Sequence, residues 1–88
     1  MKRIIFSKNA WEDYLSWQNE DRRMLKKINA LIKDIQSSPY VGMGKPEPLK
    51  FDLRGLWSRR IDREHRLVYQ VEGNELIIYS CRYHYDKK

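Results

Sequence analysis

The sequence has almost no cysteine and no long apolar stretch. Its one cysteine, Cys81, cannot form a disulfide within the chain and is typical of proteins in a reducing cytosol. No run of residues is long and apolar enough to cross a membrane. The apolar run that follows Met1 covers only residues 4–6, which is too short for a signal peptide. The sequence therefore predicts a cytoplasmic domain that has no membrane partner.

Glycine, proline and metal-binding side chains are also scarce. All three prolines and two of the four glycines lie within residues 39–48, which predicts a stiff, extended connector without regular structure. The segment Gly42-Met43-Gly44-Lys45 lacks the spacing and the strand-to-helix setting of a phosphate-binding loop. The two histidines have neither a cysteine cluster nor His-x-x-x-His spacing, so we expect no metal and no cofactor.

What the chain does contain is apolar and basic. Of its 88 residues, 41% are hydrophobic and 12% aromatic, which argues against disorder and fits a single domain, residues 1–88. Lys and Arg total 18 against 12 Asp and Glu, which gives a formal net charge of +6. A positive surplus in so small a domain suggests a polyanionic partner.

Capping residues and apolar spacing predict two helices within residues 8–37. Ser7 is placed to cap the first helix, and Asn19-Glu20-Asp21 interrupts the pattern and supplies a cap for the second. Ser37-Ser38-Pro39 ends the second helix, since proline cannot continue it. The apolar residues of the second helix recur every three or four positions: Met24, Leu25, Ile28, Leu31, Ile32 and Ile35.

The rest of the regular structure is predicted to be β. Residues 2–6 form a short strand, and turn residues separate further strands expected within 49–54, 57–63, 66–71 and 75–85. Short connections between consecutive strands favour an antiparallel arrangement. We therefore predict an α+β domain, with two N-terminal helices packed on one face of a small antiparallel sheet.

Alternation along the predicted strands separates an apolar face from a basic one. The apolar face, expected under the helices, includes Ile77 and Tyr79. Arg59 does not suit this face, and Leu76 and Ile78 do not suit the polar one; a bulge or an edge position would explain either misfit. The other face carries three arginines and a histidine: Arg60, Arg66, Arg82 and His84. These arginines either pair with Asp52, Asp62 and Glu64 or hold phosphate oxygens.

The exposed face of the second helix is also basic, with Arg22, Arg23, Lys26, Lys27 and Lys33. Such a face is either simply solvated or an electrostatic contact surface for nucleic acid.

Few side chains in the sequence can perform chemistry. Cys81 falls in the apolar phase and is expected to be a buried small hydrophobe. Glu47 lies between two prolines, and His84 is in phase with the arginines. A carboxylate base, a histidine acid and an arginine could cleave RNA without a metal. The alternatives, each favoured when taken singly, are an exposed loop acid and a frayed C-terminal histidine. The residues alone therefore indicate only a small basic domain, for which RNA is one candidate partner.

At these residues the sequence resembles the YoeB branch of the RelE-like bacterial toxins. The similarity covers nearly the whole chain as far as Tyr85, and its motifs occur in the family order. The matching stretches are Trp11-Glu12-Asp13-Tyr14-Leu15-Ser16-Trp17, Gly44-Lys45-Pro46-Glu47-Pro48-Leu49-Lys50, Leu56-Trp57-Ser58-Arg59-Arg60-Ile61, Glu64-His65-Arg66-Leu67-Val68-Tyr69 and Cys81-Arg82-Tyr83-His84-Tyr85.

The resemblance implies the toxin of a type II toxin–antitoxin pair, with the small α+β fold of microbial ribonucleases. Such toxins are ribosome-dependent endoribonucleases that cut mRNA in the decoding site. Carried over by motif, Glu47 would be the general base and His84 the general acid, and Arg66 would stabilise the transition state. Further residues would bind phosphate and position the substrate: Lys50, Arg60 and Tyr85.

The resemblance also implies partners. These are a second copy of the chain, the 70S ribosome with its mRNA, and a cognate YefM-like antitoxin whose C-terminal segment wraps the toxin. Operator DNA would be bound only through the antitoxin complex. Two other functions are alternatives: a ribosome-binding inhibitor that acts by occupancy without chemistry, and an antitoxin or DNA-binding repressor, which is disfavoured because the sequence offers no convincing helix-turn-helix.

Overall fold

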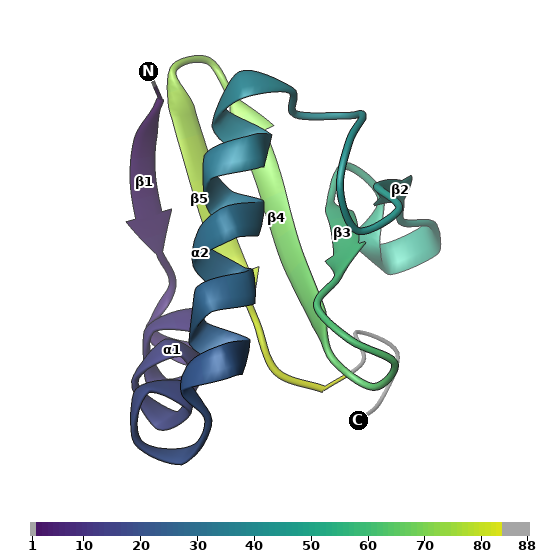
Figure 1. The fold of residues 1–88 in the computed structure, drawn as a ribbon. Helices are drawn as coiled ribbons and strands as arrows, with labels where there is room; N and C mark the ends of the chain where they lie inside the picture. The colour runs from purple at the N-terminus through teal and green to yellow at the C-terminus, as the bar shows by residue number, and fades with distance from the viewer. Residues whose placement is uncertain (1, 84–88) are drawn as a thin grey trace.

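The computed structural model describes residues 2–83 and shows two helices beside one sheet (Figure 1). The elements follow one another along the chain as β1 (Arg3–Phe6), α1 (Lys8–Glu20), α2 (Arg22–Ser37), β2 (Glu47–Pro48), the 3₁₀ turn η1 (Phe51–Leu53), β3 (Trp57–Arg60), β4 (Arg66–Glu72) and β5 (Glu75–Ser80). Within this part of the chain, no helix is both long and apolar enough to cross a bilayer.

The two helices begin and end where the sequence predicts. The Ser7 hydroxyl accepts a hydrogen bond from the Ala10 backbone N–H and so caps α1. Asp21 ends α1 and begins α2, because its carboxylate accepts from the backbone N–H groups of Arg23 and Met24. These side-chain caps satisfy donors that have no partner inside the helix.

The sheet has the strand order β1-β5-β4-β3-β2 and is mixed. The antiparallel prediction is correct for the β2–β3, β3–β4 and β4–β5 pairs, but β1 lies parallel to β5. Both helices and three strands separate β1 from β5 along the chain, so no hairpin constrains the direction of this pair. The α+β prediction is therefore confirmed, with one parallel strand at the edge.

The core lies between the helices and one face of the sheet. From α2 it takes five apolar residues of the predicted pattern: Met24, Ile28, Leu31, Ile32 and Ile35. From α1 it takes Ala10 and Trp17, whereas Trp11 and Leu15 stay largely exposed. The opposite face of the sheet has no helix over it in Figure 1.

The predicted inward phase of β5 is wrong. Leu76 and Ile78 are fully buried in the core, whereas Ile77 and Tyr79 are only partly buried. A β-bulge explains the difference, because the β4–β5 register shifts between Val68 and Tyr69. The extra residue on β5 reverses the alternation, and Cys81 is again fully buried, as predicted.

The strand predicted within residues 49–54 is also wrong. The pairing partner of β3 is instead the two-residue strand β2, which lies inside the predicted connector. After β2 the chain turns through η1, where Phe51 takes a left-handed backbone conformation with φ of 57°. Backbone hydrogen bonds from Leu53 to Lys50 and from Arg54 to Phe51 close this turn, so a strand cannot continue there.

Candidate functional site

A buried arginine fixes the loop that leads to the site. Arg59 is inaccessible to solvent and points into the helix-covered side of the sheet, so neither a bulge nor an edge position accounts for it. Each of its five N–H groups has an acceptor. The acceptors are the Tyr69 hydroxyl, one carboxylate oxygen of Asp34, and the carbonyl oxygens of Ser38, Val41 and Met43.

The carboxylate of Asp34 completes this anchor from α2. It lies 2.5 Å from the Arg59 Nη1 atom and also accepts from the Met43 backbone N–H. The hydrogen bond from Arg59 and the one from Met43 lower the pKa of Asp34. A Cβ atom at Gly42 would lie 2.3 Å from this carboxylate, so only glycine lets the loop approach so closely.

Glu47 follows this anchored loop and begins β2, where the pairing register shows which face of the sheet it points to. Glu47 lies opposite Ser58 of β3, and Ser58 lies opposite Val68 of β4. Paired residues of adjacent strands point to the same side of a sheet. Arg59 points to the helices, so its neighbour Ser58, and with it the exposed Glu47, belong to the face without helices.

Arg60 and Arg66 are a directly opposed pair on that same face. They are paired across β3 and β4, two residues along from Ser58 and Val68. Glu47 is therefore a diagonal neighbour of Arg60, at about 7–8 Å between backbone positions. Like charges placed opposite each other destabilise a sheet unless an anion offsets them.

Within residues 2–83, no carboxylate forms an ion pair with Arg60 or Arg66. The Nη1 atom of Arg66 instead donates to the carbonyl oxygens of Asp62 and His65, at 3.0 and 3.1 Å. The Asp62 carboxylate accepts from the backbone N–H groups of Glu64 and His65. Partial burial acts to raise the pKa of Asp62, but these two hydrogen bonds outweigh it, and the pKa is lowered. The ion-pair alternative is thus not realised for Arg60 or Arg66 in the described chain.

Arg82 does not join the arginine face, which corrects the sequence prediction. Strand β5 ends at Ser80, so the alternation does not extend to residue 82. The Arg82 guanidinium turns toward α1, where it donates to Glu20 at 2.8 Å and to Ser16 at 2.6 Å. It also stacks over the Trp17 ring at 4.3 Å from the centroid. The hydrogen bond from Arg82 lowers the pKa of Glu20.

His84 and Tyr85 lie outside the described residues, but the chain just before them is firmly attached. The Tyr83 backbone N–H donates to Nδ1 of His65, and its carbonyl accepts from the Arg66 N–H. The structure therefore brings residue 83 to the start of β4, beside Arg66. Sequence reasoning missed His65, although it lies within one of the family-like stretches.

Lys50 is exposed, but the register does not place it with Glu47. A backbone hydrogen bond from Leu49 to Leu56 extends the β2–β3 pairing by one residue, and the turn η1 follows. Lys50 is the capping position of that turn, so strand alternation assigns it to no face.

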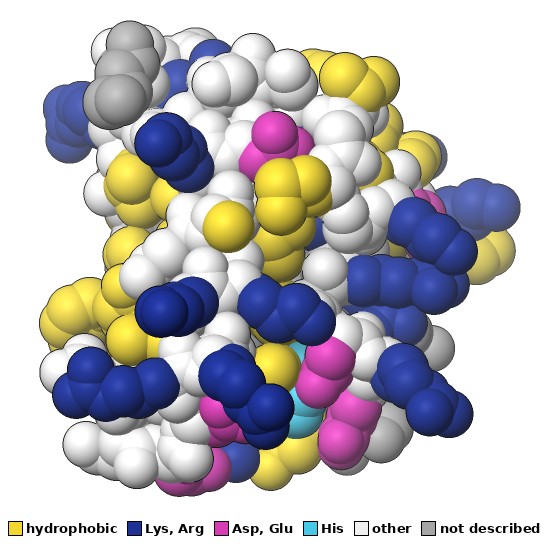
Figure 2. Space-filling view, viewed as in Figure 1, with side chains coloured by type: hydrophobic (Ala, Val, Ile, Leu, Met, Phe, Trp, Pro, Cys, Tyr) yellow, Lys and Arg dark blue, Asp and Glu magenta, His cyan; other side chains and the backbone are white. Residues whose placement is uncertain are grey.

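Four of the basic residues predicted to contact nucleic acid lie on the solvent side of α2, where Figure 2 shows dark blue side chains across this view. They are Arg22, Arg23, Lys26 and Lys27. Since α2 covers the sheet face opposite Glu47, these residues and Glu47 point to different sides of the sheet. Lys27 and Arg60 nevertheless line one hollow of about 190 Å³ beside α2.

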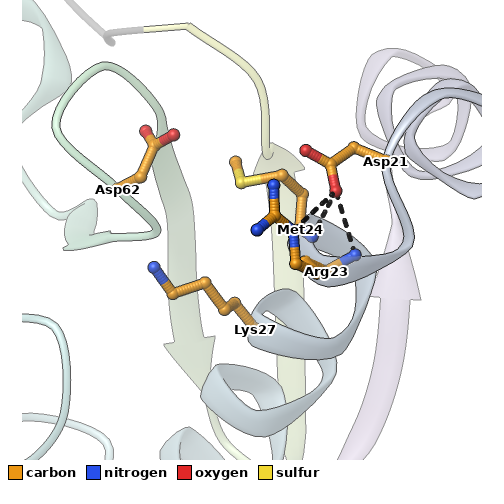
Figure 3. A pocket seen from close by; sticks show the side chains of 5 residues that line it. All are labelled: Asp21, Arg23, Met24, Lys27 and Asp62. Atoms are coloured by element: carbon orange, nitrogen blue, oxygen red, sulfur yellow. Dashed lines mark hydrogen bonds and ion pairs between the residues drawn. The ribbon is translucent and has the colours of Figure 1, made fainter.

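A second hollow, of about 400 Å³, shows that the α2 surface is not uniformly positive (Figure 3). Arg23 and Lys27 line it together with two carboxylates, Asp21 and Asp62. The Arg23 Nε atom lies 3.9 Å from an Asp21 oxygen. Arg22 and Lys26 are outside this mixed cluster. Among residues 2–83, no group of three His, Cys, Asp or Glu side chains could hold a metal ion.

Comparison with known proteins identifies the family. A family model described as the YoeB-like toxin of bacterial type II toxin–antitoxin systems matches residues 6–85. Toxin YoeB of Escherichia coli K12 is 58% identical over 83 residues, which cover 94% of this chain and 99% of that protein.

Two solved structures from Staphylococcus aureus agree. The chain of a YoeB dimer superposes with a TM-score of 0.90 at 52% identity, covering 96% of this chain and 98% of that one. A chain of a YoeB–YefM complex superposes with a TM-score of 0.89 at 50% identity, covering 97% and 99%. Since the family model and these relatives match nearly the whole chain, it belongs to the YoeB-like family of type II toxin–antitoxin toxins.

Proposed function

We propose that this toxin inhibits translation in the cytoplasm as a ribosome-dependent endoribonuclease that cleaves mRNA in the ribosomal A site. The observation that carries the proposal is the face shared by Glu47, Arg60 and Arg66. An exposed carboxylate beside two arginines without acidic partners among residues 2–83 is suited to RNA, whose 2′-hydroxyl carries a proton to remove and whose phosphodiester carries a charge to stabilise.

The proposed reaction is general acid–base catalysis without a metal. Glu47 removes the proton of the 2′-hydroxyl, whose oxygen attacks the adjacent phosphorus. His84 protonates the departing 5′-oxygen, so the products are a 2′,3′-cyclic phosphate and a 5′-hydroxyl. Arg66 stabilises the charge that builds on the phosphoryl oxygens, and Arg60, Lys50 and Tyr85 bind phosphate and position the strand.

The α2 surface supplies ribosome contact in this proposal. Arg22, Arg23, Lys26 and Lys27 bind ribosomal RNA phosphates, while the opposite face of the sheet receives the mRNA. Lys27 of this surface and Arg60 of the catalytic face line one hollow beside α2.

The toxin is further proposed to form a homodimer and to be neutralised by a YefM-like antitoxin. The dimer and the YoeB–YefM complex of the Staphylococcus aureus relatives support these partners. Operator DNA would be contacted by the antitoxin within such a complex.

Mapping of transcript 5′ ends after induction tests the proposal against inhibition by occupancy alone. Wild type should create new 5′ ends at defined codon positions, and Glu47→Ala should create none while still binding the antitoxin. Glu72→Ala is the matched control, because Glu72 is an exposed glutamate at the far end of β4. Translation arrest without new ends in wild type would favour occupancy and reject cleavage.

A further inference from the structure

His65 is a buried histidine, and one of its ring nitrogens accepts a hydrogen bond from the backbone of a segment far away in the sequence. The residue is only 8% exposed, and the Nδ1 atom of its ring accepts a hydrogen bond from the Tyr83 N–H at 2.7 Å. Nδ1 must therefore be unprotonated, and in the neutral ring the proton resides on Nε2. Nε2 lies 3.6 Å from a carboxylate oxygen of Glu64.

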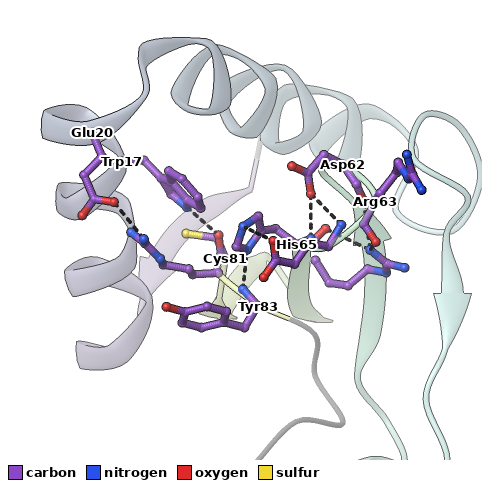
Figure 4. A network of polar contacts seen from close by, with 10 residues as sticks. Trp17, Glu20, Asp62, Arg63, His65, Cys81 and Tyr83 are labelled. Carbon is purple, nitrogen blue, oxygen red and sulfur yellow. Dashed lines mark hydrogen bonds and ion pairs between the residues drawn. The ribbon is translucent and has the colours of Figure 1, made fainter.

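The position of this ring is fixed from two sides (Figure 4). The His65 backbone N–H donates to Asp62 at 2.7 Å, and its carbonyl accepts from the Ile61 N–H at 2.9 Å. On the helix side, the Trp17 ring meets the imidazole edge to face, with centroids 4.8 Å apart. The backbone of His65 and one side of its ring are thus held, and in this arrangement Nδ1 points to the Tyr83 N–H.

Tyr83 adopts a backbone conformation that needs such support. Its φ of 64° is left-handed, which a non-glycine residue keeps only when its surroundings enforce it. Both of its backbone polar groups are engaged, the N–H by His65 and the carbonyl by the N–H of Arg66 at 3.1 Å. Without the acceptor on His65, Tyr83 can relax toward an ordinary conformation.

The segment before Tyr83 is attached independently by α1. The Trp17 indole N–H donates to the Cys81 carbonyl at 2.8 Å, and the Cys81 N–H donates to Asp13 at 3.0 Å. Loss of the His65 contact would thus release the Tyr83 N–H without releasing residue 81.

We propose that His65 is a positioning residue for mRNA cleavage, which fixes the Tyr83 backbone directly before the general acid His84. This inference rests on the proposed function. It assigns His65 no contact with substrate: the residue acts through Tyr83, and its effect falls on the step in which His84 transfers a proton.

Two substitutions that differ in where they place an acceptor test the role of Nδ1. The Oδ1 atom of His65→Asn can replace Nδ1, whereas the amide of His65→Gln extends to the position of Nε2. With purified toxin on programmed ribosomes, His65→Gln should lower kcat by about 10- to 100-fold, because a displacement of about 1 Å costs that much. KM should stay within about 2-fold in both variants, and His65→Asn should keep kcat within about 3-fold of wild type.

The thermal midpoints of both variants are measured alongside, and they should fall together because both lose the ring. Equal kcat in the two variants, or a loss confined to KM, would overturn the proposal. If wild type itself cleaves nothing, the proposed function fails. If wild type cleaves and His65→Gln matches it, only the positioning role fails.

An NMR measurement gives a second, activity-independent readout. Wild type labelled with ¹⁵N should show a coupling across the hydrogen bond between the Tyr83 amide nitrogen and Nδ1 of His65. A proton on Nδ1, or a Tyr83 amide that exchanges as fast as a solvent-exposed one, would overturn the inference.

Discussion

Two buried side chains hold the two segments of the site, and they do so in different ways. Arg59 binds the loop before Glu47 through five hydrogen bonds, to side chains and to carbonyl oxygens from residues 34 to 69. His65 binds Tyr83 through one side-chain hydrogen bond, on a segment that Trp17 also secures. The first anchor joins a helix, a loop and two strands, so its loss should affect the whole fold. The second is local, so its loss should affect mainly the reaction.

The largest effect is expected from Arg59→Met. This change leaves the Asp34 carboxylate without its charged partner and three loop carbonyls without donors. Arg59 is fully buried and makes five hydrogen bonds, and breaking such a network is among the most destabilising single changes, at about 3 kcal/mol or more, which is a large part of the stability of a small domain. Urea unfolding measures this loss.

Arg60→Met is the matched control, one residue along β3. Arg60 is exposed and has no ion pair among residues 2–83, so its unfolding free energy should change by less than about 0.5 kcal/mol. Its cleavage rate should still fall, since Arg60 is proposed to bind phosphate. Equal stabilities for the two variants would contradict the contrast between the buried and exposed arginines.

A smaller loss is expected from Trp17→Phe, which weakens the second anchor. The substitution removes the hydrogen bond to the Cys81 carbonyl and leaves part of the indole volume empty, at a cost of about 1–3 kcal/mol. Faster amide exchange at Cys81 should accompany the loss. Trp11→Phe is the control for the loss of an indole, because Trp11 is 47% exposed. A loss of unfolding free energy as large as that of Trp17→Phe would contradict the role of Trp17 as an anchor.

Acid should weaken the first anchor in a defined pH window. Since hydrogen bonds from Arg59 and Met43 lower the pKa of Asp34, its contribution to stability is present above the unfolded-state value of about 3.9. It is lost as the pH falls from there through the lowered folded-state pKa. NMR titration should show the Asp34 carboxyl titrating below its usual range, and the pKa should rise again in Arg59→Met if that variant stays folded. A normal pKa in wild type would contradict the account.

The smallest effect is a change in reactivity at Cys81. Burial raises the pKa of this thiol to about 12, so it stays protonated at neutral pH. Iodoacetamide should therefore label it only in the opened fraction of molecules, about 10⁻³ or less. Trp17→Phe should accelerate labelling more than Trp11→Phe does, and rapid labelling of wild type would show that the 81–83 segment is not held.

Local patterns were sufficient to predict the helices, because caps such as Ser7 and Asp21 and the spacing of apolar residues act within a few positions. They failed where contacts with residues far away in the sequence determine the structure. The acceptors of Arg59 come from α2, the following loop and β4, and no short sequence pattern reveals them. The bulge in β5 likewise depends on the register with β4, and it reversed the predicted faces of Ile77 and Ile78.

The residues of the candidate site likewise divide into those that a local pattern places and those that it does not. Alternation placed Arg60 and Arg66 on one face correctly, since both lie in regular strands. The assignment of Glu47 came from family resemblance, because a two-residue strand has no pattern of its own. Arg82 was misplaced because the strand ends before it. His65 was missed because its partner is a backbone N–H, which carries no signal in a side-chain pattern.

The most direct test of the proposed cleavage by Glu47 uses an mRNA that lacks one 2′-hydroxyl group. A ribosome is programmed with a message in which the nucleotide that carries the attacking 2′-hydroxyl is replaced by its 2′-deoxy form. If Glu47 activates that hydroxyl, wild-type toxin should leave the modified message intact and cut the unmodified one to a 2′,3′-cyclic phosphate. Cleavage of the deoxy message at the same phosphodiester would contradict the account.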